Sequence, residues 1–130
     1  MTINSRVRVC ELAPDEVYSK MYLESHSNTY TSYLRGKRCR NEESFFNEVS
    51  ASFQFPAYFG ENWAAFDECI QDLEWISFTR IFVLFDDFSQ AFSEPQNLQK
   101  LMQKQVVEYW NRAIKYWESQ GIIMEVWINN

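Results

Sequence analysis

Apolar residues recur along the chain with two spacings, one typical of strands and one typical of helices. Short apolar or alternating runs predict strands at 6–12, 28–34, 81–85 and 122–128. Apolar stripes at helical spacing predict helices at 14–25, 42–53, 63–73 and 98–117. Asn41 is expected to cap the second helix, whose first turn carries Glu42 and Glu43, and Ser93 with Gln96 forms a possible capping box before the last. Strands that alternate with helices favour crossover connections, so we predict an α/β fold with a small, mainly parallel sheet of three to four strands and helical crossovers.

The segment 53–75 joins an aromatic loop to the third predicted helix. Pro56 stiffens the loop, and Gly60 is expected to take the positive φ that a sharp turn into a helix often requires. Asn62 is expected to cap the helix, because its side-chain oxygen can accept a hydrogen bond from a free backbone N–H. The loop also carries Tyr58 and Phe59, and aromatic side chains beside carboxylates are typical of protein-binding surfaces.

The third predicted helix has two different faces. The apolar stripe consists of Trp63, Phe66, Ile70 and Leu73. The opposite side, at 100° per residue, carries Glu61, Ala64, Glu68 and Asp72, with Asp67 and Gln71 between the two faces. We therefore expect one buried face and one acidic, solvent-facing face.

The segment 55–70 resembles the barstar family of intracellular ribonuclease inhibitors. The residues that carry the resemblance are Phe55, Pro56, Tyr58, Phe59, Gly60, Glu61, Asn62, Trp63, Ala65, Phe66, Asp67, Glu68, Cys69 and Ile70. The resemblance extends loosely from Tyr30 to the C-terminus and implies a layered fold on a parallel sheet. We expect one domain, 1–130, in which residues 1–27 add an N-terminal strand and helix.

The resemblance also implies a function, which is occlusion of a nuclease cleft by the aromatic loop and the acidic helix. Matching positions place Tyr58, Asn62, Trp63, Ala64, Asp67 and Glu68 at the nuclease, with Phe59, Gly60, Glu61 and Asp72 beside them. Ala64 stands where the family commonly carries a carboxylate, and Glu108 is a candidate acidic contact from the last helix. The implied partner is a basic ribonuclease or nuclease toxin, and no cofactor, metal or catalytic role is expected.

Two alternatives remain open. The first is a barstar-like immunity module for a partner that is not a ribonuclease. The second is a small Mg²⁺-dependent α/β enzyme, because Asp86 and Asp87 directly follow a predicted buried strand, where such proteins often place metal chemistry. A solvated or helix-capping pair is the favoured interpretation of these two residues.

Composition narrows the choice of partner. The formal net charge is −6, which disfavours direct binding of nucleic acid and suits a basic protein partner. The basic segment 35–40 is interpreted as a solvated turn, in preference to pairing with the acidic helix. His26, the single histidine, is expected in an exposed loop.

Cysteine usage and hydropathy indicate the compartment. Three cysteines without metal-ligand spacing predict free thiols and a reducing compartment. No signal peptide or membrane span is predicted, so we expect a cytoplasmic protein, monomeric when free.

Overall fold

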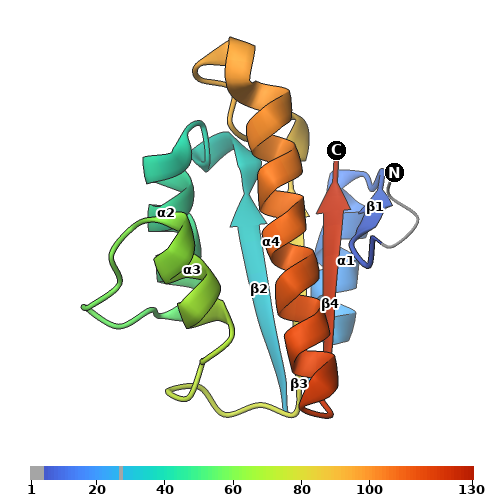
Figure 1. Cartoon of the computed structure of the whole chain (residues 1–130). Helices are drawn as coiled ribbons and strands as arrows, with labels where there is room; N and C mark the ends of the chain where they lie inside the picture. The colour runs from blue at the N-terminus through green and yellow to red at the C-terminus, as the bar shows by residue number, and fades with distance from the viewer. Residues whose placement is uncertain (1–4, 27) are drawn as a thin grey trace.

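A computed structural model describes residues 5–26 and 28–130 as three layers built on one sheet (Figure 1). Its strands are β1 (Arg8–Cys10), β2 (Thr29–Arg35), β3 (Arg80–Asp86) and β4 (Ile123–Asn129). The strand order is β1-β4-β3-β2, and every neighbouring pair is parallel. The predicted α/β fold with a small parallel sheet is therefore confirmed.

Four helices cover the two faces of this sheet. They are α1 (Pro14–Glu24), α2 (Glu42–Phe53), α3 (Trp63–Ile70) and α4 (Gln99–Ser119), with short 3₁₀ turns η1 (Gly36–Arg38), η2 (Phe88–Gln90) and η3 (Gln96–Leu98). In Figure 1, α1 lies behind the sheet, α4 lies in front of it, and α2 and α3 lie to the left, beside β2. The side chains of α2, α3 and α4 pack into one core and those of α1 into another. No helix in the described ranges combines the length and the apolar character that crossing a bilayer requires.

Asparagine side chains set the starts of α2 and α3, as predicted from their positions. The Oδ1 atom of Asn41 accepts from the backbone N–H of Ser44 at 2.9 Å. The Oδ1 atom of Asn62 accepts from the backbone N–H of Ala65 at 2.8 Å. Both bonds satisfy N–H groups that have no partner inside the helix.

The start of α4 differs from the sequence prediction. Ser93 and Gln96 are spaced like a capping box, but residues 96–98 form the turn η3, and α4 begins at Gln99 without a side-chain cap. The side-chain amide of Gln99 instead donates to the backbone oxygens of Ser89 and Ala91, at 2.9 and 3.1 Å. These bonds fix the beginning of α4 to the chain that follows β3.

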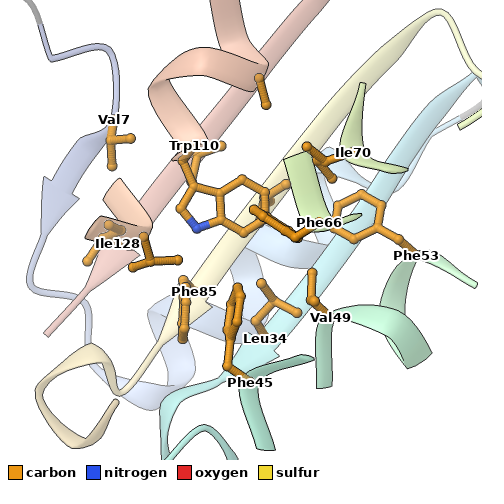
Figure 2. Close-up of a cluster of buried hydrophobic side chains, with 14 of the residues drawn as sticks. Val7, Leu34, Phe45, Val49, Phe53, Phe66, Ile70, Phe85, Trp110 and Ile128 are labelled. Carbon is orange, nitrogen blue, oxygen red and sulfur yellow. The ribbon is translucent and has the colours of Figure 1, made fainter. Parts of the chain in front are cut away.

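The main core lies between the sheet and the layer of α2, α3 and α4 (Figure 2). Phe45 of α2 is fully buried there, between Phe66 of α3 and Phe85 of β3. Its ring centroid lies within 6.0 Å of five other aromatic rings. This aromatic packing holds α2 and α3 in place against β3.

A smaller core joins α1 to the opposite face of the sheet. Val17 of α1 packs there with Phe82, Leu84 and Trp127. The ammonium group of Lys20 lies 4.1 Å from the centroid of the Trp127 ring, a cation–π distance. The strand and helix predicted near the N-terminus are thus present: β1 extends the sheet beside β4, and α1 covers the face that the other helices leave open.

Gly36, directly after β2, allows the ends of two strands to approach closely. A Cβ atom at this position would lie 2.0 Å from the backbone oxygen of Asp87 and 2.8 Å from that of Asp86. Backbone atoms cannot move aside as a flexible side chain can, so we expect Gly36→Ala to lower the free energy of unfolding by about 2 kcal/mol. Urea denaturation measures this loss.

Gly60→Ala is the matched control for that experiment. Its Cβ would meet the flexible side-chain amide of Asn62 at 3.1 Å and no backbone atom within 4 Å. An equal loss of stability in both variants would contradict the proposed clash at Gly36.

Candidate functional site

The loop between α2 and α3 turns one aromatic ring outward and two inward. Phe55 is buried, and Phe59 packs on it with ring centroids 4.9 Å apart. Tyr58, between them, exposes 68 % of its surface. A hydrogen bond of 2.9 Å from the N–H of Phe59 to the oxygen of Pro56 closes the turn that presents Tyr58.

The left-handed residue at the end of this loop that leads into α3 is Glu61, and the prediction of a positive φ at Gly60 is wrong. Glu61 has a φ of 51°, a conformation that costs a residue with a side chain about 1–2 kcal/mol. The Asn62 amide donates to the oxygen of Gly60 at 3.1 Å and closes a turn around Glu61. Glu61 is exposed as a result, directly before the first turn of α3.

The outward face of α3 presents Ala64 and Glu68, both exposed. No ion pair within the described ranges involves Glu68 or Glu61. Partial desolvation and then the negative charge of Asp72 raise the pKa of Tyr58, and Glu68 adds to the effect. The outward ring therefore lies in the negative field of Asp72, just beyond α3, and of Glu68 on α3.

The helix ends three residues earlier than its apolar stripe predicted. The last helical residue is Ile70, and Leu73 takes a φ of 49° beyond the end. That left-handed turn directs Leu73 into the core, where it is 1 % exposed. Asp72 consequently lies in a turn and is half-buried, so it is not part of a continuous helical face.

Asp67 differs from the other carboxylates of the region because the chain itself neutralises it. The guanidinium of Arg112 on α4 donates to both of its oxygens, at 3.1 and 2.6 Å. The Gln71 amide adds a third hydrogen bond at 2.8 Å. Hydrogen bonding to Asp67 raises the pKa of Arg112, so the guanidinium keeps the positive charge that offsets this carboxylate. A nuclease that bound Asp67 would have to displace these partners.

The side chain of Trp63 contributes more to packing inside the protein than to its exposed surface. Its ring stacks between Phe45 and Tyr109, with centroid distances of 5.5 and 5.2 Å. Its indole N–H donates to the carboxylate of Glu42 at the start of α2. Trp63 thereby links α2, α3 and α4 directly beneath the candidate surface.

A groove of about 590 Å³ opens where the first turns of α2 and α3 meet. Its lining consists of Glu42, Glu43, Phe46, Asn47, Glu61, Asn62 and Trp63. Sequence reasoning placed Glu42 and Glu43 only as first-turn residues of α2 and did not associate them with Glu61. The sequence could not show this grouping, because Glu42, Glu43 and Glu61 line one groove only when the starts of α2 and α3 pack together.

Asp86 and Asp87 have partners within the fold. Asp86 is buried and accepts hydrogen bonds from the Tyr33 hydroxyl at 2.6 Å, the Asn129 amide at 2.9 Å and the N–H of Asp87 at 2.9 Å. Asp87 lies 3.9 Å from Lys37 and makes no capping bond to η2. The interpretation as a solvated or capping pair is therefore wrong for Asp86. Within residues 5–26 and 28–130, no three His, Cys, Asp or Glu side chains gather as metal ligands.

The basic segment 35–40 is only partly a solvated turn. Arg35 donates to both oxygens of Glu48 on α2, at 2.8 and 3.1 Å. Arg40 lies 3.4 Å from Glu94. None of the ion pairs in the described part of the chain joins this segment to α3, so the segment neutralises neither Asp67 nor Glu68.

Comparison with known proteins identifies the family. The family described as Barstar (barnase inhibitor) has a model that matches residues 29–129, from the start of β2 to the end of β4. No curated protein matches the chain in sequence. The match covers more than half of the chain, and the parallel sheet with its aromatic loop and α3 lies within it. The chain therefore belongs to the barstar family.

Proposed function

We propose that this chain inhibits a basic ribonuclease by covering its active-site cleft with the aromatic loop and the carboxylates at the start of α2 and along α3. The observation that supports this most directly is that the exposed ring of Tyr58 lies in the field of Glu68, an exposed carboxylate that makes no ion pair in the described ranges. Carboxylates at such a surface imitate the phosphates of RNA, and the cationic groups that bind RNA then bind the inhibitor.

We further propose that the protein acts in the cytoplasm, as a monomer, on a nuclease made by the same cell. Cys10, Cys39 and Cys69 are free thiols, which suits a reducing compartment. Burial raises the pKa of Cys39 to about 12, so this thiol stays protonated and unreactive.

A pull-down from the native cell tests the proposed function. The immobilised chain serves as bait, and a double variant, Tyr58→Ala with Glu68→Gln, serves as the matched control bait. We expect ribonuclease activity in the acid-released eluate of the natural bait and at least tenfold less from the control. Equal activity from both baits, or none from either, would contradict the proposal.

A second candidate is an immunity module for a protein that is not a ribonuclease. The observation in its favour is that Ala64 supplies no carboxylate and Asp67 is neutralised by Arg112, so the surface differs from that of an inhibitor of barnase. Selective retention by the natural bait of a protein without ribonuclease activity would favour this candidate.

Restoring the absent carboxylate should improve binding to barnase. We expect Ala64→Asp to lower the inhibition constant for purified barnase at least tenfold, since a charge-assisted hydrogen bond contributes about 1.5–3 kcal/mol. An RNA-cleavage assay measures the constant. Ser19→Asp adds the same charge on α1 and serves as the control. An equal decrease in the inhibition constant for that variant would show that net charge alone causes the effect.

The association rate should depend strongly on salt. Carboxylates that steer a basic partner act over a distance that falls from about 30 Å at 0.01 M salt to about 3 Å at 1 M. We expect the rate constant with the captured nuclease to fall at least tenfold across that range while dissociation changes little. Stopped-flow Trp fluorescence measures both rates, and a flat response would exclude electrostatic steering.

A further inference from the structure

A pocket of about 400 Å³ lies between α1 and the sheet. The helix α1 covers the face of the sheet opposite the one that packs against α2 and α3. Its lining residues are Pro14, Val17, Tyr18 and Met21 from α1, with Tyr33 and Asp86 from β2 and β3. The α1 residues lie outside the segment 29–129 that matches the family. The pocket thus forms where the N-terminal helix packs against the sheet of the family fold.

Asp86 gives this pocket a negative charge without an internal counter-ion. The residue is 9 % exposed, and its three hydrogen-bond donors, Tyr33, Asn129 and the N–H of Asp87, are all neutral. Lys37, at the same end of the sheet, lies beside Asp87. The ion pairs of the described ranges do not include Asp86, although buried carboxylates usually have a cationic partner.

The other residues that line the pocket favour an organic ligand. Tyr18 exposes 75 % of its surface and Tyr33 39 %, so both rings are accessible from solvent. Burial, and then the hydrogen bond to Asp86, raise the pKa of Tyr33, so its hydroxyl stays protonated and remains a donor. Aromatic faces and the thioether of Met21 attract organic cations and apolar groups, respectively.

We propose that this pocket binds a small organic cation, with a primary ammonium group toward Asp86 and an apolar body against Tyr18, Val17 and Met21. The volume lies within the range of about 300–1,000 Å³ that is typical of small-molecule sites. A neutral ligand would leave the charge of Asp86 unbalanced. A bare divalent cation requires several oxygen ligands, and the described residues gather no such group here.

Phenethylamine is the probe, and 2-phenylethanol is its neutral counterpart with the same apolar body. Titration of protein labelled with ¹³C at the methionine methyl groups should give a saturable shift for Met21. Met102 and Met124 do not line the pocket and serve as internal references. We expect the amine to bind at least tenfold more tightly than the alcohol. Equal affinities, or a shift that does not saturate, would overturn the proposal.

Two variants test separately the contributions of the Asp86 charge and of the Tyr18 ring to amine binding. Asp86→Asn should bring the affinities of amine and alcohol to within twofold, and a preference for the amine that persists would overturn the proposal. Tyr18→Ala removes an exposed ring and should weaken amine binding at least threefold without changing the far-UV circular dichroism spectrum. If Asp86→Asn fails to fold, an unchanged affinity in Tyr18→Ala would overturn the proposal by itself.

Discussion

Replacing Glu68 by glutamine should weaken the complex with the captured ribonuclease by about 2–5 kcal/mol, or roughly 30-fold to several thousand-fold in Kd. Glutamine keeps the shape of the side chain and removes its charge, so a cation buried against Glu68 in the complex would be left without a partner. Part of this range comes from measurements on the barnase–barstar complex itself. Isothermal titration calorimetry measures the change, and the dissociation rate should account for most of it.

Asp15→Asn is the matched control for the Glu68 experiment. It removes the same charge from an exposed residue in the first turn of α1, on the opposite face of the sheet. We expect its effect on Kd to stay within threefold. If Glu68→Gln and Asp15→Asn weaken binding equally, net charge is responsible and Glu68 is not at the interface. If neither variant weakens binding, the proposed binding surface is wrong.

Replacing Phe45 by alanine should lower the free energy of unfolding by about 3–5 kcal/mol, a large part of the 5–15 kcal/mol typical of a domain. Phe45 is fully buried, and its ring contacts aromatic side chains from α3, β3 and α2 itself. The variant leaves a cavity at the junction of three elements, so the fold cannot collapse locally around it. Urea denaturation should show a lower midpoint with an unchanged slope.

Two further variants provide comparisons for the stability loss of Phe45→Ala. Phe45→Leu retains part of the buried volume and should lose less than half as much stability as Phe45→Ala. Tyr22→Ala removes an aromatic ring that is exposed on α1 and should stay within about 0.5 kcal/mol of the unaltered chain. A loss in Phe45→Ala no larger than that in Tyr22→Ala would show that this aromatic cluster does not stabilise the fold.

Local patterns in the sequence predicted most of the fold. Strand and helix periods located all four strands and all four helices to within a few residues. The caps at Asn41 and Asn62 were predictable because a cap depends on one side chain and the next few residues. The spacing of Ser93 and Gln96 satisfied the same local rule, but residues 96–98 form the turn η3 and α4 begins only at Gln99.

The candidate site was less predictable because its features depend on contacts between elements. The aromatic loop and the exposed carboxylate at Glu68 follow from sequence order and helical period alone. The pairing of Asp67 with Arg112 does not, because it requires α4 to lie beside α3. The burial of Asp86 has the same origin, since its partners come from β2 and β4.

The stacking of Trp63 between Phe45 and Tyr109 has a consequence for the kinetics of binding. The surface above this stack is preorganised, because its supporting side chain has few alternative rotamers in the free protein. Association then loses little conformational entropy, and more of the contact energy remains available to hold the complex together. A partner captured by such a rigid surface would dissociate slowly, and a residence time far longer than catalytic turnover is the property that makes a stoichiometric inhibitor effective.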